Sequence, residues 1–205
     1  MLISKLKAVW LALLGGLLLS AAVLPVQADD RAAVRQILGE SFAAMQVAKS
    51  FRSTSVTEEG GVKSTVQNDT IWPDRFHIRN GAQEFVFVPG ASYMKQGSTW
   101  TQLPVDMSEM VKSLSPDAMQ QSLANLSNAK LLGEETIKGR TAIVVEYDTH
   151  ARVMRIDTKS HVKSWIDAKT KLPIQQQAEG TAMGKRSKAF TLYDFVASLK
   201  IEAPL

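Results

Sequence analysis

Two long stretches of this chain consist of short runs rich in Val, Thr, Phe, Ile and Tyr, divided by turn-forming residues. In the first stretch, from Phe51 to Thr101, Asn80-Gly81 is the strongest hairpin signal, because it separates a run at 75–79 from a run at 83–88. Similar signals stand at Glu59-Gly60-Gly61, Pro73-Asp74, Pro89-Gly90 and Gln96-Gly97-Ser98. Runs of five to nine residues joined in this way predict an antiparallel meander.

The second stretch repeats this texture from Ala129 to Phe195. Turns are expected at Lys138-Gly139, Lys169-Thr170-Lys171 and Glu179-Gly180. The predicted strands are Ala129–Thr136, Arg140–Tyr147, Val153–Asp157, Lys163–Asp167, Ile174–Glu179 and Lys188–Phe195. A sheet of about ten strands is large enough to curl.

Two amphipathic helical segments complete the pattern. Asp30 is placed to cap a helix over Arg31–Ala48, whose apolar residues recur at steps of three and four. A second helical segment, Ser108–Leu126, is interrupted at Ser115-Pro116. The fold class predicted is α+β, with a large curved antiparallel sheet and helices covering its concave face.

The N-terminus has the pattern of a secretory signal. Lys5 and Lys7 precede an apolar run from Ala8 to Leu24, and small residues stand before an expected cleavage after Ala28. An uncleaved membrane anchor is the alternative, because the run approaches the roughly 18 residues needed to span a bilayer. We expect an exported, periplasmic protein whose mature part, 29–205, is one soluble domain.

Several classes of chemistry find little support. The chain has no cysteine, which excludes disulfides, thiol catalysis and a lipidated cysteine. Basic and acidic residues are interspersed, so no nucleic-acid surface is predicted. His77, His150 and His161 lack metal-ligand spacing and are expected on surfaces or edge strands. No Gly-x-Ser-x-Gly elbow marks a nucleophile. The sequence therefore predicts neither an enzyme nor a cofactor.

Apolar side chains, in contrast, are in excess. Strands such as 84–88 and 141–147 carry apolar residues on both faces, and only two short helical segments can cover them. A curved sheet with few helices leaves an apolar hollow, although each such residue could instead belong to the core. The candidate ligand-binding residues are Trp72, Phe76, Phe85, Phe87, Trp100, Met107, Met110, Leu114, Met119, Leu123, Trp165 and Tyr193.

Four segments resemble the periplasmic lipoprotein carriers LolA and LolB, and also the mycobacterial LppX/LprG lipid carriers and the N-terminal domain of the stress regulator RseB. They are 48–52, 97–104, 132–142 and 163–174, the last reading as strand, Asp, turn and Leu-Pro. The resemblance implies an unclosed β-barrel capped by helices, with an apolar cavity for acyl chains. Because no cysteine can be lipidated, a soluble shuttle resembling LolA fits better than an anchored carrier.

The leading functional hypothesis is a soluble periplasmic carrier for lipid, lipoprotein acyl chains or another hydrophobic ligand. Its partners would be that ligand and a membrane-associated donor or acceptor protein, with no nucleic acid. The Met107–Leu126 segment would act as a lid. The alternative is a sensor or interaction module of the same fold that recognises a protein partner, and a hydrolase is a third reading.

Overall fold

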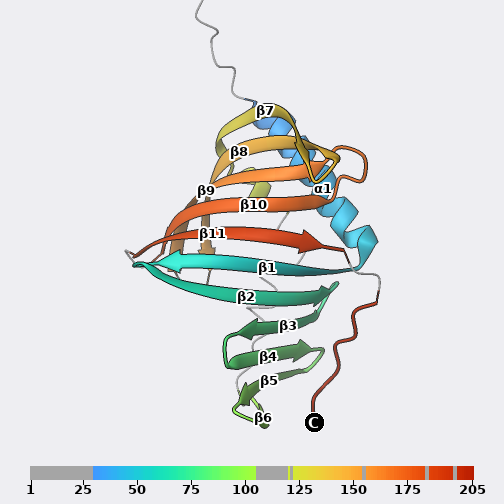
Figure 1. Cartoon of the computed structure of the whole chain (residues 1–205), viewed down its shortest axis with the longest axis vertical. Helices are drawn as coiled ribbons and strands as arrows, with labels where there is room; N and C mark the ends of the chain where they lie inside the picture. Colours follow the sequence, from blue (N-terminus) through green and yellow to red (C-terminus); the bar gives the residue numbers. More distant parts are fainter. Residues whose placement is uncertain (1–29, 105–119, 121, 154–155, 183–184, 196–197) are drawn as a thin grey trace, which may run out of the picture.

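A computed structural model describes residues 30–104, 120, 122–153, 156–182, 185–195 and 198–205. One long helix, α1 (Arg31–Ala48), precedes a single antiparallel sheet (Figure 1). The strands are β1 Ser50–Glu59, β2 Val62–Ile71, β3 Arg75–Asn80, β4 Gln83–Val88, β5 Ala91–Gln96, β6 Thr99–Gln102, β7 Ser127–Ile137, β8 Arg140–Val153, β9 Ile156–Asp167, β10 Pro173–Ala182 and β11 Lys185–Asp194.

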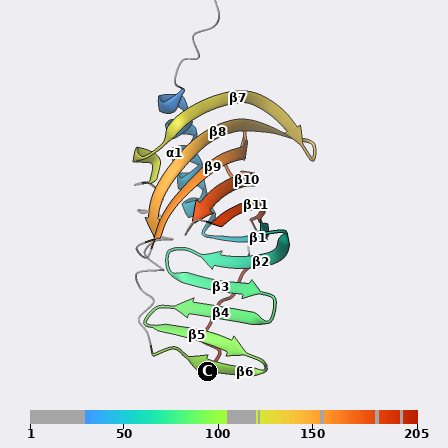
Figure 2. The same cartoon turned by 90° about the vertical axis from the view of Figure 1, so that its left-hand side faces the viewer.

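The sheet has two meanders joined at one place. Strands β1 to β6 follow one another to one edge, β7 to β11 follow one another from the other edge, and β1 pairs with β11 between them. The edge strands β6 and β7 do not pair, so the sheet curls without closing (Figure 2). The predicted unclosed barrel of the α+β class is confirmed.

Helix α1 lies inside the curl, under the strands from β7 to β10 (Figure 2). Its buried residues Val34, Leu38 and Met45 recur at helical spacing. Val34 and Leu38 pack with Val145 of β8 and Val162 of β9 in the largest buried cluster. The helix therefore exists because one apolar stripe can be buried against the concave face of the sheet.

Asp30 stands at the N-terminus of α1 but does not cap it with its side chain. Its carboxylate instead accepts a hydrogen bond from the backbone N–H of Leu131, at 2.9 Å from Oδ2. The residue predicted as a cap therefore ties the start of α1 to the edge strand β7. Within the described part of the chain, no helix has both the length and the apolar character needed to cross a bilayer.

Hairpin geometry explains most of the turn signals. Gly60 and Gly61 both have positive φ, as do Lys138 and Gly139, which suits the two-residue turns that match strand twist. The β3–β4 turn lies at Gly81-Ala82, one residue later than predicted, because Asn80 still pairs with Gln83.

Two predictions in the second meander were wrong. Val153–Asp157 is not a separate strand: Val153 ends β8 and Ile156 begins β9, so the connection falls between them. Glu179-Gly180 is not a turn but part of β10, which continues to Ala182. A Cβ on Gly180 would lie 2.7 Å from Ser160 Oγ, so this glycine allows a close approach of β10 to β9.

The strand–Asp–turn–Leu-Pro phrase has a physical basis in Asp167. Its Oδ1 accepts hydrogen bonds from the backbone N–H groups of Lys169 (3.0 Å) and Thr170 (2.8 Å), which closes the β9–β10 turn. Burial alone would raise the pKa of Asp167, but these backbone hydrogen bonds outweigh burial and hold the pKa below its usual range. Arg140 lies 3.6 Å from the same carboxylate.

Candidate functional site

The strand register divides the side chains of the sheet between two faces. Because side chains alternate along a strand, every residue paired with a helix-facing residue also faces the helix. Val145 and Tyr147 face α1, and their partners Ser164 and Val162 share that side. Following the pairing through β10, β11, β1 and β2 assigns the concave face as far as β5.

The concave face of β1 to β5 carries an aromatic cluster. The rings of Phe51 and Trp72 are 5.9 Å apart, and Trp72 meets Phe76 edge-on at 6.3 Å. Phe85 and Phe87 stack at 6.5 Å on the next strand. These separations are typical of favourable aromatic pairs. Together these rings form an apolar cluster on the concave side of the sheet.

Exposure varies across this surface. Phe76 is 1% exposed and Phe87 is 2% exposed. Ile78, Phe85 and Met94 are only half-buried, and the register places them beside one another on β3, β4 and β5. We define the concave apolar patch as Phe76, Ile78, Phe85, Phe87 and Met94. Its core is buried and its outer members can still contact a ligand.

The centre of the concave face carries polar side chains that are hydrogen-bonded to one another. Tyr193 donates to Gln176 Oε1 at 3.2 Å, and Gln176 Nε2 lies 3.2 Å from Ser164 Oγ and 3.4 Å from the Tyr147 hydroxyl. Ser55 and Thr191 share a hydrogen bond of 2.7 Å. Burial raises the pKa of both tyrosines, so both stay neutral.

The structure places half of the candidate ligand-binding residues on the concave side of the sheet, in two separate clusters. Those on the concave side are Trp72, Phe76, Phe85, Phe87, Leu123 and Tyr193. The predicted lid residues Met107, Met110, Leu114 and Met119 lie outside the described residues. At the end of that segment, residues 122–124 are helical, and Leu123 and Leu126 pack in the α1 cluster.

Trp100 and Trp165 lie on the opposite, outer face. Trp165 packs with Ala142 and Val144, and its Nε1 donates to Glu135 at 2.7 Å. Trp100 packs with the cluster formed by Val86, Tyr93 and Ile201. The physical reason is the pleat, because a change of one residue in register moves a side chain to the other face.

The C-terminal segment covers part of that outer face. Ile201 is buried against Val86 and Tyr93, and its carbonyl accepts a hydrogen bond from Arg75 Nη1 at 2.9 Å. The segment runs across the direction of the strands, from the level of β2 towards β6 (Figure 1). This cover explains why β4 and β5 carry apolar residues on both faces.

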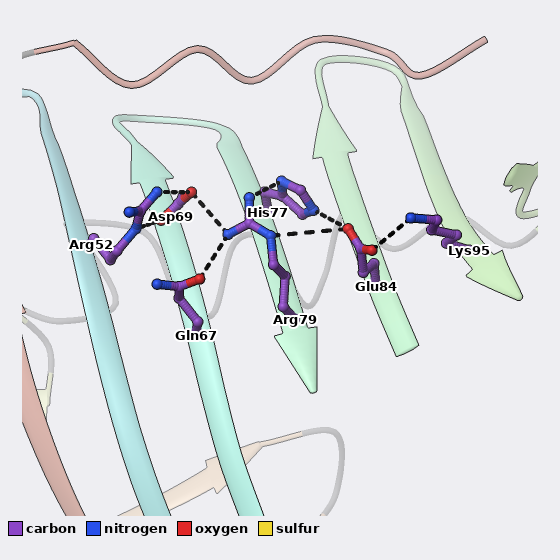
Figure 3. A network of polar contacts seen from close by, with 7 residues as sticks. All are labelled: Arg52, Gln67, Asp69, His77, Arg79, Glu84 and Lys95. Carbon is purple, nitrogen blue, oxygen red and sulfur yellow. Dashed lines mark hydrogen bonds and ion pairs between the residues drawn. The ribbon is translucent and has the colours of Figure 1, made fainter. Parts of the chain in front are cut away.

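Next to this segment, a line of charged side chains crosses the outer face of β1 to β5 (Figure 3). Asp69, 4% exposed, binds Arg52 through two hydrogen bonds and Arg79 through a third at 3.0 Å. Burial would raise the pKa of Asp69, but the two arginines outweigh it and hold the pKa below its usual range.

Glu84 continues the line. Lys95 donates to it at 2.8 Å and His77 Nε2 lies 2.9 Å away, and these contacts hold the pKa of Glu84 below its usual range. Arg79 Nη2 lies 2.8 Å from His77 Nδ1. Because a guanidinium can only donate, Nδ1 accepts and the proton of the neutral ring sits on Nε2, facing Glu84. His77 lies on the outer surface of the sheet, one of the two positions expected for it, although its strand β3 is interior and not at an edge.

This charged line resembles catalytic machinery only in its residue types. Each of its carboxylates is paired with cations. The chain contains no cysteine, and none of the hydrogen bonds described for the members of this line involves a serine or threonine hydroxyl. Over the described residues, no group of three or more His, Cys, Asp or Glu side chains could hold a metal ion. The arrangement suits a structural role on the outer face of the sheet.

The outer face also has a groove of about 560 Å³ between β1, β9, β10 and β11. Val56 and Phe190 form its apolar part, and charged side chains such as Glu58, Lys63 and Glu179 surround them. A groove lined largely by charges is poorly suited to an acyl chain, because chain burial there would desolvate charged groups. The concave face is the better hydrophobic surface.

Sequence reasoning missed the charged line and the polar centre of the concave face. Arg52, Asp69 and Arg79 come from three strands, and only the register brings them together. A signal was present in β1, where Ser53, Ser55 and Thr57 alternate on one face. Hydroxyl residues on the buried side of a strand are unusual, and this pattern could have been noticed.

Solved structures share this architecture. LppX, a lipoprotein of Mycobacterium tuberculosis, aligns over 83% of this chain and 99% of its own, with a TM-score of 0.58 and 12% identity. LprF from Mycobacterium bovis aligns over 84% of this chain and 97% of its own, with a TM-score of 0.55 and 14% identity. The chain has the LolA/LolB-like fold.

At these identities the likeness establishes the LolA/LolB-like fold alone. MucB, in the MucA/MucB complex of Pseudomonas aeruginosa, aligns over 78% of this chain and 57% of its own at 19% identity, and its TM-score of 0.45 supports no argument. No protein-family model matches the sequence, and no curated protein is significantly similar to it.

Proposed function

We propose that this protein carries a hydrophobic ligand, a lipid or a lipoprotein acyl chain, on the concave face of its LolA/LolB-like sheet. The observation that carries the proposal is the concave apolar patch. Its half-buried members Ile78, Phe85 and Met94 extend a buried aromatic base, and they lie beyond the strands that α1 contacts. The methionine side chain is flexible and adapts to ligands of varied shape.

The energetics favour such a ligand. Moving an acyl chain out of water yields about 0.8 kcal/mol per buried methylene. A chain of sixteen carbons therefore gains roughly 12 kcal/mol before the costs of immobilisation are subtracted. Even half of that sum corresponds to micromolar to millimolar binding, which suits a carrier that must also release its cargo.

We extend the proposal to the place where the carrier works. Residues 1–28 have the pattern of a cleavable secretory signal, so the carrier would act in the periplasm between a membrane-associated donor and an acceptor. The mass of the protein recovered from its own host tests this point. A chain that begins at Asp29 supports export with cleavage, and a full-length chain contradicts it.

Nile red, a neutral dye that fluoresces in apolar surroundings, tests binding at the concave face. Replacing Phe85 with alanine removes a half-buried ring of the patch, worth about 1.4 kcal/mol to a ligand in contact with it, so Nile red should bind about tenfold more weakly. Leu192→Ala is the matched control, because Leu192 is 37% exposed and lies on the outer face.

If the wild-type protein binds no Nile red, the carrier proposal fails. Equal weakening by Phe85→Ala and Leu192→Ala would place the binding surface elsewhere. A stoichiometric protein partner recovered from periplasmic extract, together with no dye binding, would favour a sensor or interaction module of the same fold.

A further inference from the structure

The charged side chains of this sheet are distributed unequally between its faces. In β1 to β5 and β8 to β11, the pairing register places the charged residues with described side chains on the outer face, with two exceptions. The exceptions are Glu59 and Lys185, the end residues of β1 and β11, and they form an ion pair with each other at 3.2 Å. Apart from this ion pair, the concave side of these strands carries no charged residue with a described side chain.

This face is uncharged without being uniformly apolar. Its central strip lies on β10, β11, β1 and β2 and bears hydroxyl and amide side chains. The strip consists of Gln176, Thr191, Tyr193, Ser53, Ser55, Asn68 and Thr70. It separates the α1 cluster from the concave apolar patch. The side chains of Ser53 and Ser55 are small, and their partners on β11 and β2 are larger, so β1 forms a low floor at these two positions.

Two polar atoms on the concave side of the sheet are buried and lack hydrogen-bond partners in the described structure. They are the acceptor Asn68 Oδ1 and the donor Trp72 Nε1. Asn68 and Thr70 lie on the concave side of β2, and Trp72 directly follows this strand with its ring against Phe51 and Phe76. Asn68 Nδ2 already donates to Thr70 Oγ1 at 3.2 Å. Buried groups of this kind are usually satisfied in the functional state, because leaving each one unpaired costs about 1–3 kcal/mol.

We infer that the ligand is an uncharged acyl ester bearing a free hydroxyl, of the acylglycerol type. Its chain lies on the concave apolar patch, and its polar part lies over β1 and β2. The ester carbonyl accepts from Trp72 Nε1, and the hydroxyl donates to Asn68 Oδ1. A carboxylate or phosphate on this strip would be desolvated without a partner, because Lys185, already paired with Glu59, is the one cation with a described side chain on the concave side of β1 to β5 and β8 to β11.

This inference rests on the proposed carrier function and adds the chemical class of the cargo. The test displaces Nile red from the wild-type protein at pH 8.5 with three ligands that share one eighteen-carbon chain: monoolein, methyl oleate and oleate. Monoolein offers both ester and hydroxyl, methyl oleate offers only the ester, and oleate is an anion. We expect monoolein to bind at least tenfold more tightly than oleate, with methyl oleate between them.

A pair of neighbouring variants tests the face itself. Ser53→Lys puts a cation on the concave floor between Tyr193 and Asn68, and Thr54→Lys puts one on the outer face of the same strand. Ser53→Lys should reverse the preference, so that oleate binds more tightly than monoolein, and Thr54→Lys should leave it unchanged. A circular dichroism melt confirms that each variant is folded.

The outcomes separate the two proposals. Oleate binding as tightly as monoolein to the wild-type protein overturns the inference and leaves the carrier proposal standing. The same holds if Ser53→Lys and Thr54→Lys shift the preference equally. If Ser53→Lys does not fold, Asn68→Leu replaces it: monoolein should then lose its advantage over methyl oleate, and an unchanged advantage overturns the inference. No binding of Nile red or of any of the three ligands overturns both proposals.

Discussion

Replacing Asp69 with asparagine should destabilise the protein by about 3 kcal/mol. Asp69 accepts three hydrogen bonds from Arg52 and Arg79, and hydrogen bonds to charged groups contribute roughly 1.5–3 kcal/mol each. Asparagine keeps one acceptor oxygen and turns an NH₂ group towards the arginines. The two arginine side chains are 37% and 33% exposed, so they recover part of the loss by hydration, which brings the net cost to about 3 kcal/mol.

Urea unfolding followed by tryptophan fluorescence measures this cost. With a denaturant slope of about 2 kcal/mol/M, the midpoint of Asp69→Asn should fall by about 1.5 M at pH 7. Glu179→Gln is the control, because Glu179 pairs with Lys188 at 2.8 Å but both side chains are more than half exposed. Exposed pairs contribute little, so its midpoint should move by less than about 0.3 M.

The pH dependence of the difference follows from the lowered pKa of Asp69. A carboxyl group whose pKa is lower in the folded protein stabilises it fully above the unfolded pKa of about 3.9. That contribution is lost as the pH falls through the folded pKa. The gap between wild type and Asp69→Asn should therefore stay constant from pH 7 to pH 5 and shrink only below about pH 4. A gap under 1 kcal/mol at pH 7, or one that narrows between pH 7 and pH 5, would contradict this role of the Asp69 carboxylate.

Two further substitutions test the packing of the sheet. Gly180→Val should lower the free energy of unfolding by about 2 kcal/mol, because its Cβ would lie 2.7 Å from Ser160 Oγ and 3.0 Å from a backbone oxygen of β9; an unchanged melting temperature would show that the strands are not in this register. Phe87→Ala should cost about 3–5 kcal/mol in urea unfolding, because Phe87 is 2% exposed, and a cost below 1 kcal/mol would contradict its placement in the core.

The sequence predicted correctly the bounds of those helices and strands whose two ends are marked by a local signal. Helix α1 begins and ends where its apolar stripe predicted, between Asp30 and Lys49. Strand β4 matches its predicted bounds because Gly81 precedes it and Pro89-Gly90 follows it. The β8–β9 connection was misplaced because no glycine, proline or asparagine marks it in the sequence.

The faces of the sheet could not be read in the same way. Trp100 and Trp165 are of a residue type that is common on ligand-binding surfaces. Their pairing with Lys95 and with Val144 nevertheless places them on the outer face of the sheet. Side-chain direction depends on register, and register depends on partners distant in sequence, such as the β1–β11 pair. Residue type therefore predicted an apolar surface, and only the pairing showed which residues share it.

Native mass spectrometry of the protein purified gently from its own host, without detergent, tests whether it carries a lipid. A carrier should show a species one lipid heavier than the apo chain, and organic extraction should release an acyl-containing compound from it. The Phe85→Ala variant, prepared in parallel, should carry less of this compound. Apo protein alone from repeated preparations, with no binding of Nile red by the wild type, would contradict the account.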